Sequence, residues 1–534
     1  MYQTRPADSG FPGPRPRCHR PPCRRGDHHQ REAALSSPDA AVSYGRRLAD
    51  IAAQSPDATA MIFVTGAGAE HRVTWAQLDH RSNRVARGLT GLGISHGDIV
   101  VIGLPNSIEH VVIAFGAWKA GACVLPLRSD LPEWERGRVL DVTRPAVVVA
   151  SWPDREGQRV IAARTLEDPA ISTEPVPDRT PDPARAIATS GSTGVPKVIC
   201  IKGSGTFSLA GTEYDSAREM GHRAGQIQLV PAPLYHTNGA LITFTALLQR
   251  QVVILLEHFV AELVLSLIER YRVNTLTATT IMLQRMARCA DVHRRDLNSV
   301  ESLLHGGAPL PDWLARFWID RLGAGRFYVA YGSSENAGSC LATGEELLAR
   351  PGTVGRPVNS ELRILDDAGG QVAPGVVGTI HFRRPGQTEP VFRYLGDTRP
   401  ATTADLFTSV GDMGWVDDDG YLYLADRRVD LIISGGVNVY PAEVEAALTE
   451  HPAVADAVVV GLPDPEWGKR VHAVIELSDP AAAPSAAELR SYCRERLAAH
   501  KVPKTIEFVV ALPRTAAGKI RRGDMARQRN GFNS

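Results

Sequence analysis

The sequence predicts an α/β protein with a large N-terminal domain of parallel, helix-covered sheets plus a small β-rich subdomain, and a small α+β C-terminal domain. Three observations predict this. Apolar runs alternate with helical periodicity from about residue 40 to 340, short strands and turns follow residue 360, and a separate α+β pattern begins beyond Arg427. At 534 residues the chain exceeds what one core usually serves. We therefore expect a large domain over residues 36–427 and a small one over residues 428–534.

The N-terminal segment, residues 1–35, holds almost no aliphatic side chains. Such a segment cannot bury enough surface to offset the entropy of ordering, so we expect a disordered tail. Cys18, Cys23, His28 and His29 are zinc-ligand types, but nothing around them predicts even a small core, and we favour disorder over a metal site.

In the large domain, a T-x-x-Q capping box at Thr74 predicts the start of a helix. The run IVVIGLPN (99–106) predicts a buried strand, Ser107 caps a helix with apolar residues at helical spacing, and ACVLPL returns as a strand. This order is a βαβ unit. Helices over 260–271 and 311–322 alternate with apolar strands in the same way, which predicts parallel sheets.

The C-terminal third has shorter elements. Asp419-Gly420 predicts a hairpin in the β-rich subdomain. In the small domain, Pro441 opens a helix. We expect the remaining elements to be strands 453–461 and 470–477, a helix near 485–499 and strand 505–511.

Composition narrows the function classes. Lysine plus arginine (59) balance aspartate plus glutamate (59), so no net charge points to nucleic acid or an anionic membrane as the partner. No window approaches the roughly 18 uncharged apolar residues of a membrane span. The seven cysteines are scattered and lie mostly in apolar stretches, as is typical of reduced buried thiols, so we expect a cytoplasmic protein.

A loop rich in glycine and hydroxyls follows the predicted strand ARAIA and reads TSGSTGVPK (189–197). Its glycines let backbone N–H groups approach a ligand, its hydroxyls add donors, and Lys197 supplies a point charge, which together predict phosphate binding. It is not a Walker A loop, because Lys197 stands between Pro196 and Val198 rather than in Gly-Lys-Ser/Thr. A flexible surface turn is the structural alternative.

Four further motifs carry candidate chemistry. Glu335 in VAYGSSENAG has a carboxylate that could hold magnesium between phosphates, and GGAPL (306–310) is a tight turn suited to a planar base. Asp412 could bind ribose hydroxyls and Arg427 a phosphate, with a structural ion pair as the alternative. Lys519 lies on a polar, glycine-containing loop near the C-terminus.

Together, in this order and at these separations, the motifs resemble the superfamily of adenylate-forming, AMP-binding enzymes that includes acyl-CoA synthetases, firefly luciferase and peptide-synthetase adenylation domains. The resemblance covers about residues 40–525. TSGSTGVPKVI, PLYHTNGA, SGGVNVYPAEVE and EWGKRVHAV look most like bile-acid-CoA and fatty-acyl-CoA ligases. The resemblance implies a ligase that uses ATP, Mg²⁺ and CoA: a carboxylate attacks the α-phosphate of ATP to give acyl-AMP and pyrophosphate, and a thiol then displaces AMP.

The resemblance also implies roles for individual residues. Lys519 would bridge the carboxylate to the α-phosphate, Glu335 would hold the metal, and His236 would line the acyl site, although a core histidine fits it equally well. Gly435 and Gly436 would let the pantetheine chain of CoA pass. The implied nucleotide-binding residues are Thr189, Ser190, Gly191, Ser192, Thr193, Gly194, Lys197, Gly307, Ala308, Pro309, Tyr331, Gly332, Ser334, Glu335, Asp412, Arg427 and Lys519.

In the same superfamily the small domain is mobile and rotates between the two half-reactions. The hinge position, two residues after Arg427, usually carries aspartate or lysine in this superfamily, and here it is Val429. This departure bears on the rotation needed for the thiol step and leaves adenylation untouched. Two alternatives stay open: an adenylating enzyme that passes the acyl group to an amine, a carrier-protein thiol or another nucleophile, and a nucleotide-binding regulatory protein without catalysis. The acid, whether aliphatic, aromatic or steroid, is not readable, and we expect a monomer or homodimer.

Overall fold

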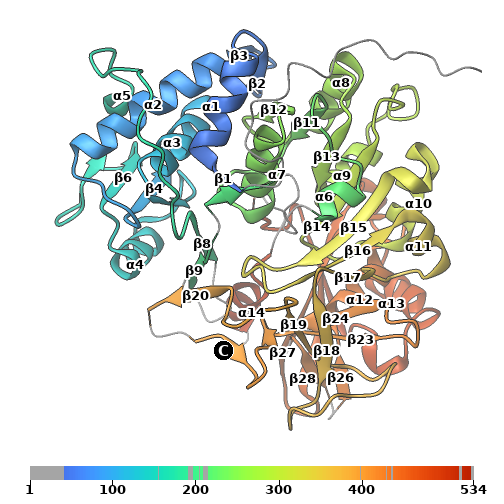
Figure 1. Cartoon of the computed structure of the whole chain (residues 1–534). Coiled ribbons are helices and arrows are strands. Elements are labelled where there is room, and N and C mark those ends of the chain that lie inside the picture. The colour runs from blue at the N-terminus through green and yellow to red at the C-terminus, as the bar shows by residue number, and fades with distance from the viewer. Residues whose placement is uncertain are drawn as a thin grey trace, which may run out of the picture.

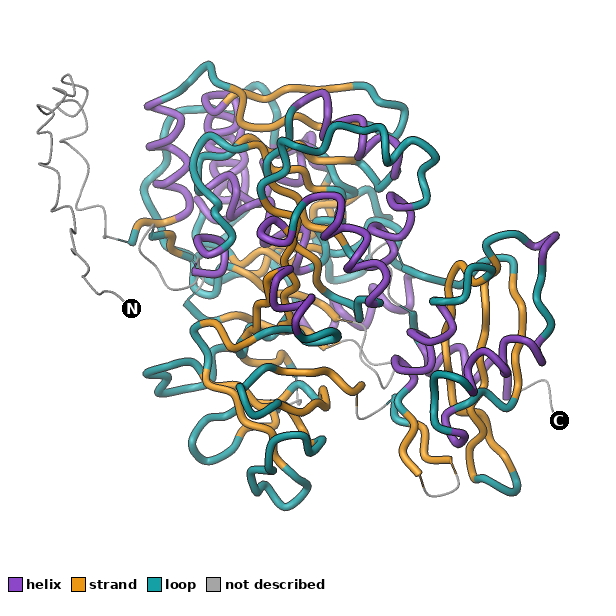
Figure 2. Tube along the Cα trace, turned by 90° about the vertical axis from the view of Figure 1, so that its right-hand side faces the viewer, coloured by secondary structure: helices purple, strands orange, loops and turns teal. Residues whose placement is uncertain are grey.

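The computed structural model describes residues 41–153, 155–189, 197–203, 205–208, 215–396, 399–427, 430–434, 437–515 and 520–530. The tail over residues 1–35, with its cysteines and histidines, lies outside these ranges. The described chain forms a large domain and a smaller C-terminal domain, which Figure 2 shows at the right as a lobe of strands and helices. This arrangement confirms the α/β class and the order of a large and a small domain.

A seven-stranded sheet forms one half of the large domain. Its centre is parallel, as predicted from the βαβ unit, because β4 pairs in parallel with both β5 and β6. Its edge is antiparallel, since β9 follows β8 after a loop too short for a crossover. In order the strands are β20 (Phe392–Leu395), β9 (Lys197–Ile201), β8 (Arg185–Thr189), β5 (Cys123–Pro126), β4 (Ile99–Gly103), β6 (Val147–Ala150) and β7 (Val160–Ile161).

A nine-stranded sheet forms the other half. Its six central strands run parallel, and short hairpins add antiparallel strands at both edges. In order the strands are β17 (Arg356–Val358), β16 (Ser339–Thr343), β15 (Phe327–Gly332), β14 (Ser302–Gly306), β13 (Thr275–Ala278), β11 (Ile227–Val230), β12 (Val252–Leu256), β2 (Thr59–Val64) and β3 (Glu70–Thr74).

The helices lie in layers between and outside the two sheets (Figure 1). The largest core cluster joins both sheets to the helices between them, namely α1 (Tyr44–Gln54), α2 (Trp75–Gly91), α3 (Ile108–Lys119) and α7 (Thr237–Leu248). Val100 and Ile102 of β4 face this layer, whereas Val101 between them faces α4 (Glu133–Thr143) on the opposite side. Outside the nine-stranded sheet lie α8 (Ala261–Tyr271), α9 (Thr280–Ala287) and α10 (Asp312–Leu322).

The shorter elements of the large domain complete these layers. They are β1 (Val42–Ser43), which pairs with β10 (Thr206–Phe207), and the helices α5 (Ala163–Leu166), α6 (Asp215–Glu219), η2 (Ala324–Arg326) and α11 (Gly344–Ala349).

The β-rich subdomain is a six-stranded sheet below the two large ones in Figure 1. The predicted hairpin is confirmed, because β23 and β24 pair antiparallel across a turn in which Gly420 has a positive φ of 82°. The strands are β21 (Ala401–Thr402), β22 (Thr408–Ser409), β19 (Gly378–Arg383), β23 (Asp412–Val416) and β24 (Leu422–Arg427), with β18 (Glu361–Leu365) beside β19.

The described part of the small domain packs three α-helices on a three-stranded sheet, with a hairpin before it. Pro441 opens its first helix as predicted, but the helix expected near 485–499 ends at Arg494 and a short 3₁₀ turn follows. The strands are β25 (Ile432–Ser434), β26 (Val437–Val439), β27 (Val454–Asp464), β28 (Gly468–Leu477) and β29 (Thr505–Val509). The helices are α12 (Pro441–Thr449), η3 (Pro480–Ala482), α13 (Ala486–Arg494), η4 (Ala499–Lys501) and α14 (Arg522–Asn530).

The predicted helix starts are confirmed by side-chain caps. The Thr74 hydroxyl accepts from Gln77 N while the Gln77 side chain accepts from Thr74 N, so both halves of the capping box form. Ser107 caps α3 by accepting from His110 N. Among the described residues, none of the helices combines the length and apolar character needed to cross a bilayer.

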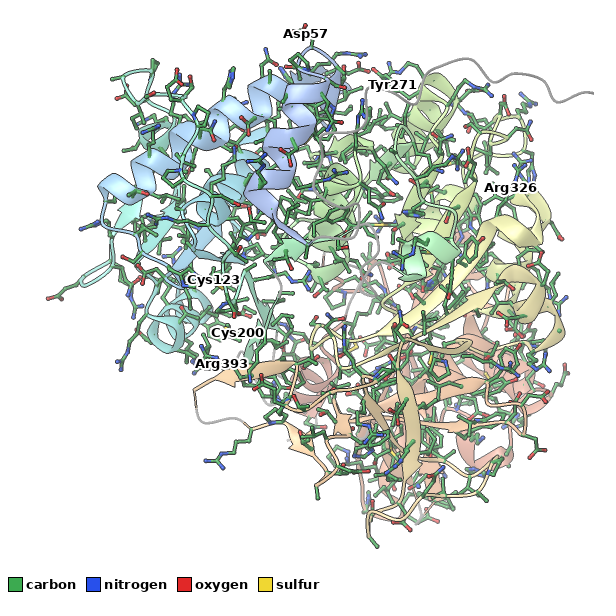
Figure 3. All side chains as sticks on the ribbon, viewed as in Figure 1. Asp57, Cys123, Cys200, Tyr271, Arg326 and Arg393 are labelled. Carbon is green, nitrogen blue, oxygen red and sulfur yellow. The ribbon has the colours of Figure 1, made fainter. Side chains whose placement is uncertain are left out.

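The five described cysteines are buried free thiols, as expected. The Cys123 and Cys200 thiols lie within hydrogen-bonding reach of each other in the seven-stranded sheet, and this bond together with burial raises the pKa of Cys123 (Figure 3). Burial raises the pKa of Cys289 and of Cys493 to about 11. Cys123, Cys289 and Cys493 therefore stay protonated and unreactive at neutral pH, whereas the bond with Cys123 lowers the pKa of the Cys200 thiol.

A buried histidine in α3 predicts how stability depends on pH. His110 is 1% exposed, and burial lowers its pKa to about 4. The unfolded chain binds this proton near pH 6.5 and the folded chain does not, so stability is lost as pH falls from 6.5 towards 4. Between pH 7 and pH 5 we expect His110 to account for a loss of about 2 kcal/mol. Denaturant titrations of the parent and of His110→Asn should show a shallower pH slope in the variant; equal slopes would contradict the assignment.

Candidate active site

The candidate site lies where three sheets meet. β8 is parallel to β5 and ends at Thr189, and β9 begins at Lys197, which pairs with Thr189. Both residues thus lie at the carboxyl edge of the seven-stranded sheet, which is where ligands bind in open α/β sheets. The loop between them, residues 190–196, lies outside the described residues.

A tyrosine from a distant strand joins the predicted lysine to the predicted acidic residue. The Tyr394 hydroxyl donates to Glu335 Oε1 at 2.9 Å, and the Lys197 ammonium lies 5.3 Å from the Tyr394 ring centroid. β20 pairs antiparallel with β9, with Tyr394 opposite Ile199, so Tyr394 and Lys197 share a face of the sheet. Burial and the Glu335 carboxylate raise the pKa of the Tyr394 phenol, which therefore stays a donor. Sequence reasoning missed Tyr394, because nothing local to FRYL marks it.

Removal of the Tyr394 hydroxyl should weaken the hold on Glu335. We expect Tyr394→Phe to lower kcat/KM for MgATP about ten- to hundredfold, since a hydrogen bond to a charged group contributes about 1.5–3 kcal/mol. Tyr328→Phe is the matched control, because the Tyr328 hydroxyl donates only to the Gly325 carbonyl at 3.1 Å. Equal kinetics for the two variants would exclude a positioning role for Tyr394.

The loop after β15 is tied to the start of α7. Ser334 and Thr237 hydroxyls lie 2.8 Å apart, and a Cβ at Gly307 would lie 3.4 Å from the Asn238 side-chain nitrogen. Gly307 has a φ of +88°, which the turn requires, and the Gly307-Ala308-Pro309 stretch is exposed and accessible. Thr237 and Asn238 were missed as site residues, although they follow His236 in the quoted motif PLYHTNGA.

His236 stands at the position before α7, where its ring lies 4.6 Å from that of Tyr235. His236 is half-buried. The next two residues, Thr237 and Asn238, are the ones that contact Ser334 and lie near Gly307. The geometry thus places His236 at the edge of the site.

The β-rich subdomain contributes Asp412. The Tyr331 hydroxyl donates to Asp412 Oδ2 at 2.7 Å, which joins the end of β15 to the start of β23. Arg427 is described along its backbone only, where it pairs with Asp412 across the hairpin. The structure therefore brings together the aromatic residue and the carboxylate that were predicted for adenine and ribose.

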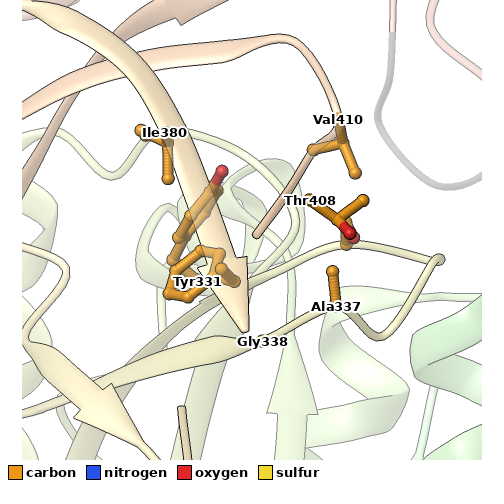
Figure 4. A pocket seen from close by; sticks show the side chains of 8 residues that line it. Tyr331, Ala337, Gly338, Ile380, Thr408 and Val410 are labelled. Atoms are coloured by element: carbon orange, nitrogen blue, oxygen red, sulfur yellow. The ribbon is translucent and has the colours of Figure 1, made fainter. Parts of the chain in front are cut away.

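A small pocket opens beside the Tyr331 ring, between the loop after β15 and the subdomain (Figure 4). Its wall is largely apolar, with Ile380, Phe382, Thr408 and Val410 from the subdomain side. A Cβ at Gly338 would lie 2.5 Å from the Phe382 ring, so a glycine is required for the loop to pack this closely. The centroids of the Tyr331 and Phe382 rings lie 6.0 Å apart.

The described part of the site offers one carboxylate to a divalent cation. In the described ranges, no group of three or more His, Cys, Asp or Glu side chains gathers in a way that could hold a metal ion. Glu335 nonetheless offers one carboxylate, and Tyr394 links it to Lys197. Mg²⁺ is commonly bound through one or two carboxylates plus substrate phosphates, which matches this donor set.

Several predicted site residues cannot be placed. Lys519, Gly435, Gly436 and the hinge residue Val429 lie outside the described residues.

Comparison with known proteins identifies the family. Residues 48–391 match the family described as AMP-binding enzyme, and residues 443–519 match the AMP-binding enzyme C-terminal domain. The chain belongs to the AMP-binding enzyme family. This confirms the resemblance to adenylate-forming enzymes, and the family's two parts correspond to the large and small domains of the fold.

Named relatives share most of the chain's length. Feruloyl-CoA synthase of Amycolatopsis sp is 34% identical over 472 residues, covering 85% of this chain and 94% of the relative. Fatty acid–[acyl-carrier-protein] ligase ScoC of Streptomyces coeruleorubidus is 30% identical over 491 residues, covering 86% of this chain and 93% of the relative.

Solved structures of o-succinylbenzoate CoA synthetase of Bacillus subtilis also resemble this AMP-binding enzyme. The complex with an acyl-adenylate intermediate has a TM-score of 0.77 at 29% identity and covers 91% of this chain and 98% of that one. A complex of the same synthetase with ATP and magnesium ion has a TM-score of 0.75 at 30% identity, and it covers 89% of this chain and 98% of the synthetase chain.

Proposed function

We propose that this protein is an ATP-dependent carboxylic acid–CoA ligase, which forms acyl-AMP and pyrophosphate and then acyl-CoA and AMP. The observation that carries the proposal is the convergence of Lys197, Glu335 and Tyr394 at the phosphate-loop edge of an AMP-binding enzyme. Relatives that are CoA ligases, one of them solved with an acyl-adenylate, support the two-step reaction.

The first half-reaction brings two anions together, a carboxylate and a triphosphate. Catalysis is therefore mainly positioning and charge neutralisation. Lys197, with the backbone and hydroxyl donors of residues 189–194, would bind the β- and γ-phosphates. Glu335, held by Tyr394, would bind the Mg²⁺ that enters with ATP and neutralises phosphate charge. Ser334 would contact the α-phosphate.

The nucleoside end would bind between the nine-stranded sheet and the six-stranded sheet of the subdomain. Tyr331 would stack on adenine against the exposed Gly307-Ala308-Pro309 turn, Gly332 would leave room beside it, and Asp412 would accept from the ribose hydroxyls. Arg427, opposite Asp412 in the hairpin, would contact a phosphate. His236 at the edge of the site would line the acyl pocket.

Both half-reactions would use the small domain. Lys519 would stabilise the charge that develops during adenylation, and the loop that carries Gly435 and Gly436 would replace it when the thiol attacks. Buried free thiols and the use of ATP and CoA support a cytoplasmic protein.

A second candidate keeps the adenylation step and changes the acceptor to a carrier-protein thiol. The fatty acid–[acyl-carrier-protein] ligase among the relatives favours it. Because both candidates share the first half-reaction, only the acceptor distinguishes them.

The test is to incubate the protein with MgATP and ferulate, 2-succinylbenzoate, dodecanoate or cholate, and to follow pyrophosphate and AMP. A CoA ligase should release AMP and form a thioester only when CoA is added. AMP release that responds to a holo carrier protein and not to CoA would establish the second candidate. Absence of acid-dependent pyrophosphate with every acid would contradict both.

A further inference from the structure

We propose that the ion pair between Glu135 and Arg521 is a positioning pair, which favours the arrangement of the two domains in which adenylation occurs. The proposal rests on the proposed function, since it assigns the pair to one of its two half-reactions. The pair joins a residue in the first turn of α4 in the large domain to a residue just before α14 in the small domain.

The pair has the geometry of a charge-assisted hydrogen bond. Arg521 Nη2 donates to Glu135 Oε1 at 2.8 Å, and the side chains are 37% and 10% exposed, respectively. Such bonds to a partly buried carboxylate are stronger than surface ion pairs. Across the described ranges, it is the one ion pair that joins the small domain to the large one.

The position of Glu135 connects the pair to the active site. α4 follows β5 in the chain and packs against the seven-stranded sheet, so its first turn lies at the carboxyl end of β5. β8 is parallel to β5 and ends at Thr189, beside Lys197. Glu135 is therefore on the same edge of the sheet as the phosphate loop. An arginine that binds Glu135 brings its own segment to that edge.

The neighbours of Arg521 show that this segment is anchored in the small domain. Ile520 packs against an apolar cluster of that domain. Arg522 pairs with Glu445 at 2.7 Å and with Asp430 at 3.3 Å, both in the small domain. Of two consecutive arginines, one therefore binds its own domain and the other crosses to the large domain.

A second polar contact crosses between the domains without an ion pair. Arg288, at the end of α9, donates to the carbonyl oxygens of Val454 and Ala455 at 3.4 and 3.2 Å. A rotation of the small domain that withdraws Arg521 breaks the charged contact at the site edge. The Glu135–Arg521 pair thus stabilises this arrangement and not the rotated one.

The half-reactions measured separately provide the test. Arg521→Gln and Glu135→Gln should each slow acid-dependent ATP–pyrophosphate exchange about three- to tenfold, the range expected for such a bond. The acid is the one of the four above with the fastest pyrophosphate release. Conversion of the corresponding synthetic acyl-adenylate with CoA should be unchanged or faster. The double variant should lose no more ATP–pyrophosphate exchange activity than either single variant. Arg521→Lys should retain most of the parent's exchange activity.

Asp141→Asn is the matched control, because Asp141 lies on the same helix and pairs with Arg155 of its own domain at 3.0 Å. Equal losses in both half-reactions, no loss in exchange, or the same loss in the control would overturn the proposal. Amide hydrogen exchange provides a test that needs no substrate. Arg521→Gln, and not Asp141→Asn, should speed amide exchange around Val454 and Ala455, whose carbonyl oxygens accept from Arg288. Unchanged exchange there would also overturn it. Failure of the proposed function would appear instead in the parent protein, as no acid-dependent pyrophosphate.

Discussion

Replacement of Lys519 by alanine is expected to slow acyl-adenylate formation by about 10²- to 10³-fold, the usual effect of removing a group that stabilises developing transition-state charge. The thiol step should survive, because the adenylate is already activated and the proposed mechanism assigns that step to the loop that carries Gly435 and Gly436. The measurement is single-turnover pyrophosphate release, compared with the conversion of synthetic acyl-adenylate and CoA to thioester.

Lys202→Ala is the control for Lys519→Ala, because Lys202 forms an exposed ion pair with Glu389 at 2.5 Å. It should leave both half-reactions unchanged. A Lys519→Ala variant that loses both half-reactions equally would contradict the assignment of Lys519 to adenylation alone.

Asp79→Ala is expected to destabilise the large domain by about 3–5 kcal/mol, the usual cost of leaving a buried charge without its partner. Lys119 of α3 is 4% exposed at the side chain, and its ammonium donates to Asp79 Oδ1 at 2.5 Å and to Asn83 Oδ1 at 2.7 Å. Burial lowers the pKa of Lys119, and Asp79 opposes this shift. Without Asp79 the ammonium would lose its counter-charge between α2 and α3.

The measurement is urea unfolding followed by a probe in the large domain. A double replacement, Asp79→Leu with Lys119→Met, should recover much of the loss, since an apolar pair of similar volume needs no counter-charge. If Asp79→Ala lowers the free energy of unfolding by less than about 1 kcal/mol, water or Asn83 already satisfies the Lys119 ammonium.

The fold was largely predictable because its signals are local. The βαβ unit follows from an apolar run, the Ser107 cap and a helical spacing, all within thirty residues. The hairpin at Gly420 likewise follows from two adjacent residues. The antiparallel edges of both large sheets were not predicted, because a strand's direction depends on which neighbour it pairs with, and pairing is not encoded in a single run.

The site was predictable where a motif is contiguous and not where it is assembled. Glu335 and Lys197 belong to recognisable strings, and the structure places both beside Tyr394. Tyr394 itself is separated from them in the chain and reaches them through the pairing of β20 with β9. The contact between Arg521 and Glu135 spans two domains and has no local signal at all.

The return of β20 to the seven-stranded sheet also protects the protein from self-association. β20 covers β9, whose Ile199 and Ile201 are buried. Were the chain to stop at residue 391, where the large family match ends, β9 would become a bare edge with unpaired N–H and C=O groups. One short strand thus supplies Tyr394 to the candidate site and covers an edge that would otherwise be free to pair with another chain, so its loss would promote aggregation as well as inactivity.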